Sequence, residues 1–403
     1  MYYKKLAALA ASMLLGLGLS LPAQQVHAGE AQKTKYPIIL AHGMAGWDEI
    51  AGIDYFGNET GVFALDGCGL LEINGCNDDV NGSQMATAFQ VTSLADSETR
   101  GTQLTDQIQS YMASKGVSYV NLVGHSQGGF DIRKAAHLLK SRKGYTVVNN
   151  LISISSPHRG SPYAKKLLDK YALNGSSFCW NMAWDGKPAN DPCGVLITKI
   201  ADSLFDALNQ SSASTRNNII AAGKQLVYSD YDPNDGVTTG AKAFNAKYNL
   251  KNSAGQYVAT RFRSIITAQD DGNRNPVISA LHTLLGFNAD GDGYCVDDCD
   301  NDGAAGKGDG SVYDMDDDGL VGVNSQQMGG RLQYNSILGV LDTLTETTVT
   351  AVDDLNNPSS AAMTSQTAIV KQDHLDVVAV GPDTFDELEF YAAINDYIAK
   401  AGG

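Results

Sequence analysis

A serine set between glycines, after an apolar strand and before a helix, constrains this chain most. The run from Val117 to Val123 is typical of a buried strand, and residues 130–139 have a helical pattern. Between them lies Gly124-His125-Ser126-Gln127-Gly128-Gly129. Glycines at these places permit a strained turn that projects the Ser126 hydroxyl above a sheet, at a helix N-terminus. The order predicts Ser126 as a nucleophile; the alternative is an ordinary glycine turn.

A second strand–loop unit lies closer to the N-terminus. Residues 36–41 form a short apolar run that ends in His42-Gly43-Met44-Ala45-Gly46. This pattern predicts a buried strand that opens into a glycine-rich loop. The 403 residues, 43% of them hydrophobic and 18% charged, are enough for one large α/β domain or two smaller ones.

A serine hydroxyl needs a general base, and the base needs an acid that orients it. After this kind of turn, the expected chain order is serine, acid, histidine. His374 is late and lies in a polar segment, so it is the predicted base, with a surface histidine as the alternative. His137 and His158 follow the serine too closely, and His282 lies in an apolar run where a packing role is expected.

The acid is less strongly marked. Asp318 precedes a short apolar stretch, as expected at the C-terminal end of a strand, and is preferred. Asp235 precedes a helical pattern at 238–247 and is interpreted as a capping or turn residue. Asp353 and Asp354 are further candidates.

Residues 1–28 have the pattern of a signal peptide. Lys4 and Lys5 precede an apolar run from Leu6 to Leu21, and Val26-His27-Ala28 ends in small residues. The alternative is a membrane anchor, but the run is short for a bilayer. We therefore expect a secreted, extracellular protein without stable membrane insertion. The net charge of −16, lowered further by the loss of both lysines, argues against nucleic acid as a partner.

Six cysteines lie after the signal segment, and an even number in an oxidising compartment suggests disulfides. Their close spacing favours three local pairs, although other pairings are possible and a zinc site is disfavoured. The expected pairs are Cys68 with Cys76, Cys179 with Cys193, and Cys295 with Cys299.

Several motifs, taken together and in order, resemble the bacterial true lipases, the secreted triacylglycerol lipases of the Pseudomonas and Burkholderia type. The similarity runs from about Tyr36 to near Ala401 with insertions. The segments that carry it are His42-Gly43-Met44, Gly124-His125-Ser126-Gln127-Gly128, Ser156-Pro157-His158-Arg159-Gly160-Ser161, Ala243-Phe244-Asn245-Ala246-Lys247-Tyr248, Asp318-Gly319-Leu320-Val321-Gly322 and His374-Leu375-Asp376.

The resemblance implies an α/β-hydrolase fold with a mostly parallel central sheet flanked by helices, in one catalytic domain over residues 29–403. It implies Ser126 as nucleophile, His374 as base and Asp318 as acid, and it demotes Asp235, since the 243–248 motif precedes the acid. Backbone N–H groups of Met44 and Gln127 would form the oxyanion hole. Asp376 matches a calcium ligand of the family.

The chain departs from the family at three points. Asn324 stands where the family has a disulfide cysteine, and the family's first calcium aspartate has no clear match. The segment between Asp318 and His374 is longer, with a Thr/Ser-rich insertion at 330–370.

Residues 288–317 form an acidic insertion. From Asn288 to Gly319 the chain has 11 aspartates, one lysine and no glutamate, arranged in three Asp/Asn-x-Asp-x-Asp-Gly hexads that end at Gly293, Gly303 and Gly319. Alternate carboxylates on a turning loop converge on a cation, so we expect structural Ca²⁺; a solvated acidic loop is the alternative. Asp318 is assigned to the catalytic site rather than to the metal. The predicted ligands here are Asp290, Asp292, Asp298, Asp300, Asp302 and Asp309.

Residues 161–214 correspond to the region where these lipases carry a lid. Apolar residues recur at 196, 200, 204 and 208, with Asp202 and Asp206 opposite, so an amphipathic helix is expected. It is either a lid or an ordinary core helix.

The sequence thus predicts a secreted serine carboxylic-ester hydrolase that acts on lipid or ester at an oil–water interface, with a triacylglycerol lipase favoured. An esterase or polyesterase is the alternative, and a non-catalytic calcium-dependent surface protein is a third reading. The resemblance also suggests a dedicated foldase as a partner during export.

Overall fold

The computed structural model describes residues 33–44, 49–50, 53–54, 85–171, 212–270, 272–285, 316–336, 342–363, 365–378 and 385–403. In these ranges the strands are β1 (Ile38–Ala41), β2 (Glu49–Ile50), β3 (Ile53–Asp54), β4 (Ala86–Ala88), β5 (Val120–His125), β6 (Val148–Ile154), β7 (Ala259–Thr267), β8 (Gly330–Asn335), β9 (Thr343–Glu346) and β10 (Ile369–Val370). The helices are α3 (Ser97–Lys115), α4 (Gly128–Lys143), α5 (Pro162–Tyr171), α8 (Ser212–Gln225), α9 (Ala241–Lys247), α10 (Pro276–Leu285), α12 (Ser360–Met363), the short 3₁₀ turn Asp376–Val378 and α13 (Glu387–Lys400).

Eight of the described strands form one sheet in the order β4-β1-β5-β6-β7-β8-β9, with β10 beside β7. The pairs are parallel except for β8 and β9. The inner strands β1 and β5 are buried along their whole length, as expected when helices cover both faces of a parallel sheet. The two predicted strand–loop units are therefore neighbours at the centre of the sheet.

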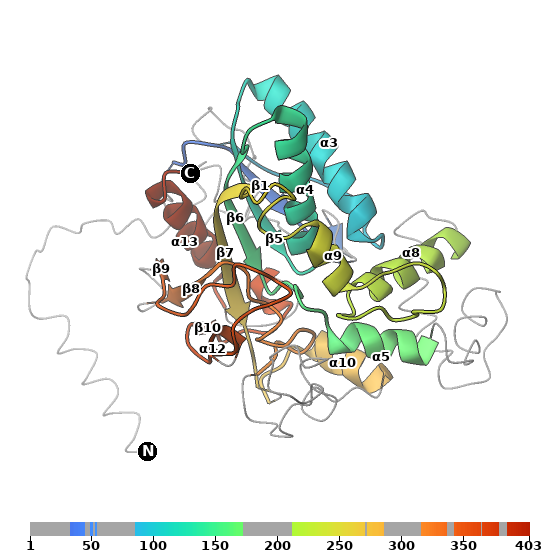
Figure 1. Ribbon diagram of the computed structural model, residues 1–403. Coiled ribbons are helices and arrows are strands. Elements are labelled where there is room, and N and C mark those ends of the chain that lie inside the picture. The colour runs from blue at the N-terminus through green and yellow to red at the C-terminus, as the bar shows by residue number, and fades with distance from the viewer. Residues whose placement is uncertain are drawn as a thin grey trace, which may run out of the picture.

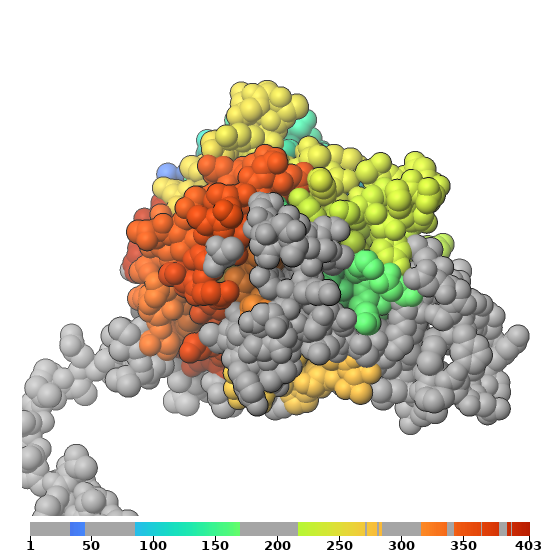
Figure 2. Space-filling model, turned by 60° about the horizontal axis from the view of Figure 1, so that its bottom comes forward, coloured from blue at the N-terminus to red at the C-terminus, as the bar shows by residue number. Residues whose placement is uncertain are grey.

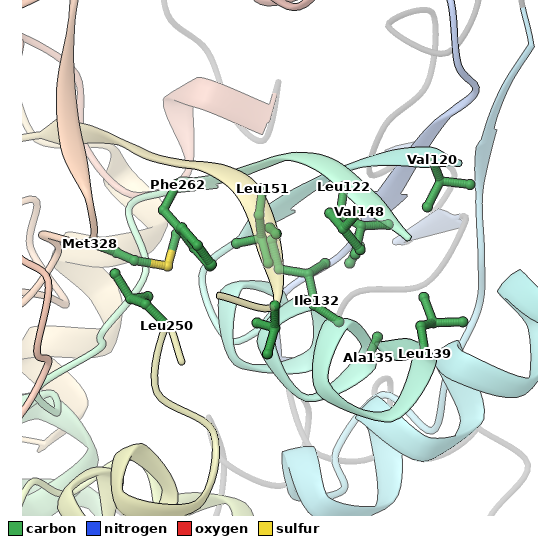
Figure 3. Close-up of a cluster of buried hydrophobic side chains, with 14 of the residues drawn as sticks. Val120, Leu122, Ile132, Ala135, Leu139, Val148, Leu151, Leu250, Phe262 and Met328 are labelled. Atoms are coloured by element: carbon green, nitrogen blue, oxygen red, sulfur yellow. The ribbon is translucent and has the colours of Figure 1, made fainter. Parts of the chain in front are cut away.

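Helices α3 and α4 cover one face of this sheet, and α13 covers the other (Figure 1). Figure 3 shows side chains of β5 and β6, among them Leu122 and Val148, packed toward Ile132 and Leu139 of α4. On the opposite face, Phe390 and Ile394 of α13 belong to a second buried cluster. Full burial of an aliphatic or aromatic side chain contributes about 1.5–3 kcal/mol, so these two clusters hold the sheet between its helical layers.

Local sequence sets the ends of α3. Asp96 caps the first turn by accepting a hydrogen bond from the Thr99 N–H at 2.9 Å. Gly116 ends the helix with φ of 66°, a conformation that glycine adopts at low cost. Leu104, Ile108 and Met112 recur every four residues on its buried side.

Helices α5 and α10 follow the C-terminal ends of β6 and β7, and they lie together at one end of the molecule (Figure 1). Figure 2 brings this end forward, with α5 in green and α10 in yellow-orange. Leu168 of α5 packs near Leu226 and Phe244, and Phe130 at the start of α4 joins the same cluster. This end of a parallel sheet is where α/β proteins build their sites.

Several predictions lie outside the described residues: the signal segment, all six cysteines, the lid helix, and the aspartates 290, 292, 298, 300, 302 and 309. The Thr/Ser-rich stretch 330–370 holds β8, β9, α12 and β10, so it contributes strands to the main sheet. Of the helices in the described ranges, none combines the length and the apolar character needed to span a membrane.

Candidate active site

The turn at Ser126 links the end of β5 directly to the start of α4. Ser126 has φ of 55°, a left-handed conformation that costs a non-glycine residue about 1–3 kcal/mol. A Cβ atom on Gly128 would collide with the carbonyl oxygen of Ala41 in β1, and one on Gly124 would lie 2.5 Å from the Gly128 carbonyl oxygen. The glycines of the motif are therefore required by the close approach of backbone to backbone.

Ser126, His374 and Asp318 are brought together from distant parts of the chain. The Oγ of Ser126 lies 2.8 Å from Nε2 of His374, and Nδ1 of His374 lies 2.8 Å from Oδ2 of Asp318. A carboxylate can only accept, so Nδ1 carries the imidazole proton and Nε2 is left to accept the serine proton. Asp318 is fully buried and His374 nearly so, while Ser126 is partly exposed.

Asp318 lies in a tight turn, held by main-chain contacts. Its Oδ1 accepts from the N–H groups of Leu320 at 3.1 Å and Val321 at 2.8 Å. A bridge between Asp317 and Gly322 closes this turn ahead of β8. The expectation that Asp318 stands at the C-terminal end of a strand is therefore wrong, because residues 316–322 fold back on themselves.

The competing acids are placed elsewhere. Asp235 accepts from the Val237 N–H and pairs with Lys224 at 2.6 Å on the surface, which is a turn role. Asp354 accepts from the Asn356 N–H and the Asn249 amide. His374 bonds to Asp318 instead of either residue.

The other histidines fill structural positions. His137 bonds to the Asn249 carbonyl, and His158 bonds to the Ser153 hydroxyl at 2.9 Å. His282 contacts the Gly319 carbonyl at 2.5 Å and is largely buried, which fits its expected packing role. Burial lowers the pKa of His137 and His158, so both stay neutral near pH 7.

Met44 lies on the loop after β1, and Gln127 follows Ser126 at the N-cap of α4. Among the described residues, no acceptor is paired with the backbone N–H of either one. Two such donors beside a serine nucleophile suit a developing oxyanion.

A buried arginine holds the loop that carries Met44. Arg100 of α3 donates to the carbonyl oxygens of His42 at 2.6 Å and Gly43 at 3.1 Å. Its guanidinium also pairs with Asp131 of α4 at 2.8 Å, and both side chains are buried. The arginine thus joins the loop before Met44 to the helix after Ser126.

The sequence motifs do not mark Arg100 or Asp131 as site residues. A signal existed, because Arg100 begins the buried stripe that continues through Leu104 and Ile108. A charge in such a stripe predicts a buried partner, although not which one. The same environment affects His42: burial, and then the charge of Arg100, lower its pKa to about 3, so it stays neutral.

Asp376, the predicted calcium ligand, lies beside a second buried carboxylate. Asp376 Oδ1 accepts from the Asn275 side-chain amide at 3.1 Å, and Oδ2 accepts from the Asp373 N–H at 3.2 Å. Burial, and then the charge of Asp376, raise the pKa of Asp373 to about 6. A hard cation would relieve this repulsion, so the pair fits one side of an oxygen-ligated site. Within the described ranges, no three or more His, Cys, Asp or Glu residues form a metal cluster.

Residues 37–216 match the sequence profile of the palmitoyl protein thioesterase family. This stretch contains Ser126, Met44 and Gln127, whereas Asp318 and His374 lie beyond it.

Triacylglycerol lipases from several bacteria are among the curated relatives. The chain is 36% identical to one from Vibrio cholerae over 132 residues, which is 33% of this chain and 36% of that protein. It is 28% identical to one from Burkholderia plantarii over 214 residues, 52% of this chain and 50% of the relative. It is 32% identical to one from Pseudomonas fragi over 141 residues, which is 34% of this chain and 40% of that protein. The chain thus spans between a third and a half of the length of these relatives.

Two solved structures resemble the chain more distantly. A Bacillus licheniformis lipase in its mature form is 14% identical with a TM-score of 0.38, covering 86% of this chain and 88% of that one. A Legionella pneumophila phospholipase is 12% identical with a TM-score of 0.37, and the match covers 91% of this chain and 64% of that one.

The relatives are named as triacylglycerol lipases and the matched family as a thioesterase, so both names describe hydrolysis at an acyl carbon. The mostly parallel sheet, its flanking helices and the strained serine turn fit an α/β-hydrolase fold. The lipase relatives come from several bacterial genera, so they do not single out the Pseudomonas and Burkholderia type. Together they support a hydrolase of carboxylic esters within the lipase superfamily.

Proposed function

We propose that this chain is a secreted serine carboxylic-ester hydrolase, and specifically a triacylglycerol lipase. The observation that carries the proposal is the continuous Ser126–His374–Asp318 chain, with both contacts at 2.8 Å. The local identity to triacylglycerol lipases favours that substrate over other esters.

In the first half-reaction, Ser126 Oγ attacks the ester carbonyl carbon while Nε2 of His374 takes the hydroxyl proton. The carbonyl oxygen becomes an oxyanion between the N–H groups of Met44 and Gln127, each contributing ~3 kcal/mol to the transition state. The carbon–oxygen bond to the alcohol then breaks, and the leaving alcohol takes the proton from His374. A Ser126 ester of the fatty acid remains.

In the second half-reaction, His374 Nε2 takes a proton from water as the water oxygen attacks the acyl carbon. The bond to Ser126 Oγ breaks, and the proton returns to that oxygen. A fatty acid leaves and the resting serine is restored. Throughout, Asp318 accepts from Nδ1 and stabilises the imidazolium form without taking its proton.

Thioester hydrolysis is the second candidate, because residues 37–216 match the palmitoyl protein thioesterase family. The steps would be the same with a thiol as leaving group. Because the same catalytic residues would act in both reactions, the two activities would differ only in the substrate, whose leaving group is a thiol in one case and an alcohol in the other.

The test compares three substrates with the full chain: emulsified long-chain triacylglycerol, a soluble short-chain ester and a palmitoyl thioester. A rate that rises once the emulsion forms, and is lost in Ser126→Ala, supports the lipase. Ser110→Ala, on the exposed side of α3, is the matched control and should keep full activity. Activity confined to the soluble ester supports an esterase or polyesterase instead. Turnover that survives Ser126→Ala contradicts the mechanism, and folded protein without any turnover supports the non-catalytic surface protein.

We also propose structural Ca²⁺ and export by the segment 1–28. Calcium at Asp376 would fix the loop that carries His374, since the two residues are two positions apart. The acidic stretch 288–317 is the second proposed calcium region.

Fusion of residues 1–28 to a reporter should direct it out of the cell, and retention of the fusion would contradict the export proposal. A foldase is the proposed export partner; its addition should raise the refolding yield of the denatured chain, and an unchanged yield would contradict it.

A further inference from the structure

One oxygen of Asp318 receives hydrogen bonds from more than the catalytic histidine. Besides His374 Nδ1 at 2.8 Å, Oδ2 accepts from the Thr267 hydroxyl at 3.0 Å and from Nε2 of Gln326 at 3.3 Å. Thr267 is the last residue of β7, and Gln326 lies in the loop between the Asp318 turn and β8. Two neutral side chains thus approach the oxygen that orients the imidazole.

The Thr267 hydroxyl belongs to a chain with a fixed direction. Asp318 can only accept, so Thr267 donates to it; its approach to Gln326 Oε1 is longer, at 3.3 Å. Ser155 Oγ lies 2.6 Å from Thr267 Oγ1, and because the threonine proton is already committed, Ser155 is the donor of that contact. The order of donation is therefore Ser155 to Thr267 to Asp318.

Gln326 holds Thr267 in place through the backbone. Its Oε1 accepts from the Thr267 N–H at 2.8 Å, and its Nε2 donates to the Thr267 carbonyl at 2.8 Å. The same Nε2 reaches the Val321 carbonyl at 3.0 Å. One side-chain amide thus ties the end of β7 to the turn that carries Asp318.

Ser155 is held in an unusual conformation to reach this chain. It follows β6 with φ of 51°, the left-handed region that non-glycine residues avoid. Ser155, Thr267, Gln326 and Asp318 are all fully buried. Strain at a buried residue persists only where surrounding contacts enforce it, and here the strained residue places its hydroxyl against Thr267.

We propose that Thr267, backed by Ser155 and Gln326, is a positioning residue that sets how Asp318 supports His374. The hydroxyl shares Oδ2 with the imidazole, so it fixes the carboxylate orientation and withdraws part of its negative charge. This inference rests on the proposed hydrolase function, which Ser126→Ala tests separately.

The experiment compares Thr267→Val, which removes the hydroxyl with little change of shape, and Thr267→Ser, which keeps it. In Thr267→Val we expect kcat on a soluble ester to fall about tenfold with KM little changed. The acid limb of the kcat/KM profile should move to higher pH, because a carboxylate with one donor fewer stabilises the imidazolium more strongly. Thr267→Ser should restore both kcat and the profile.

A matched control lies three residues away on the same strand. Ser264 is also fully buried, and its Oγ has no hydrogen-bond partner among the described residues. Ser264→Ala should leave kcat and the pH profile unchanged.

An unchanged profile and kcat in Thr267→Val overturn the proposal. Equal losses in Thr267→Val and Thr267→Ser, with the pH profile unmoved, overturn it as well, because they indicate a packing role. Wild-type turnover that depends on Ser126 in the same assay shows that either failure concerns Thr267 and not the hydrolase function.

Discussion

The imidazole of His125 donates a hydrogen bond from Nε2 to the backbone carbonyl oxygen of His374 at 2.9 Å. The carbonyl can only accept, so Nε2 carries the proton. Burial, and then the neighbouring His374, hold the pKa of His125 well below its usual range, so it stays neutral. The residue before the proposed nucleophile thus anchors the loop of the proposed base.

Replacing His125 should therefore impair turnover more than folding. In His125→Ala we expect kcat to fall by about tenfold, because the His374 carbonyl loses its donor and the loop gains freedom. The comparison is His137→Ala, which removes a half-buried histidine that bonds to the Asn249 carbonyl and should lower the melting temperature with kcat retained. The measurements are steady-state kinetics and thermal unfolding of both variants. Equal kcat in the two variants would refute the anchoring role.

Arg100 should affect stability and catalysis through different contacts. Arg100→Met leaves Asp131 buried without its cation, which costs about 3–5 kcal/mol of the free energy of unfolding. It also frees the His42 and Gly43 carbonyls, so kcat should fall by roughly 100-fold as the oxyanion loop loses its position.

The double variant Arg100→Met/Asp131→Leu separates these effects. It removes both buried charges, so urea unfolding should show most of the lost stability restored, whereas kcat should stay low. Recovery of kcat along with stability would mean that Arg100 does not position the loop.

The buried carboxyl of Glu389, on α13, predicts that the free energy of unfolding depends on pH through a group away from the active site. Burial, and then the charges of Asp386, Asp342 and Asp396, raise the pKa of Glu389 from 4.5 to about 7. The folded state therefore binds more protons than the unfolded state between these values, and stability is lost as pH rises through 7. Glu389→Gln should be more stable than wild type by about 1–2 kcal/mol at pH 8 and equal to it at pH 4.

Glu98 provides the control of opposite sign. Burial opposes its ionisation, but hydrogen bonds from Lys134, Lys247 and Tyr248 outweigh burial and lower its pKa. The contribution of Glu98 to the free energy of unfolding is present above its usual pKa and is lost as pH falls. Glu98→Gln should therefore make the folded protein less stable than wild type at pH 8. The free energy of unfolding of both variants at pH 4 and pH 8 is the check. A destabilised Glu389→Gln at pH 8 would contradict the prediction.

Calcium removal should act through Asp376 if the proposed ion binds there. We expect saturating Ca²⁺ to raise the melting temperature by roughly 5 °C, and a chelator to reverse this. Asp376→Asn should abolish most of that shift. A shift that persists in Asp376→Asn and disappears in Asp300→Asn/Asp302→Asn would place the stabilising ion in the acidic stretch instead.

The serine turn could be predicted from sequence because its constraint is local. Gly124, Ser126 and Gly128 lie within five residues, and close backbone contacts explain each glycine: Gly124 meets the backbone of Gly128, and Gly128 meets Ala41 of β1. The expected strands before Ser126 and before His42 are present as β5 and β1. Chain order and family resemblance then pointed to His374 and Asp318, which the structure brings within hydrogen-bond distance of one another.

The residues that the sequence did not reveal depend on distant partners. Arg100 and Asp131 lie on different helices, and Thr267 meets Asp318 across 51 residues. A neutral threonine at the end of a strand carries no pattern that distinguishes it from an ordinary β residue. The pattern at Asp318 predicts a strand end where the structure has a turn, because a short apolar stretch such as Leu320 to Val323 follows either one.

The most direct test of the central claim is active-site labelling with a chromogenic phosphonate ester, which phosphonylates an activated serine and releases p-nitrophenol. We predict one equivalent of p-nitrophenol per folded chain, an adduct located on Ser126 by peptide mass spectrometry, and labelling slowed by orders of magnitude in His374→Ala. An adduct on another residue, or equal labelling rates in wild type and His374→Ala, would contradict it.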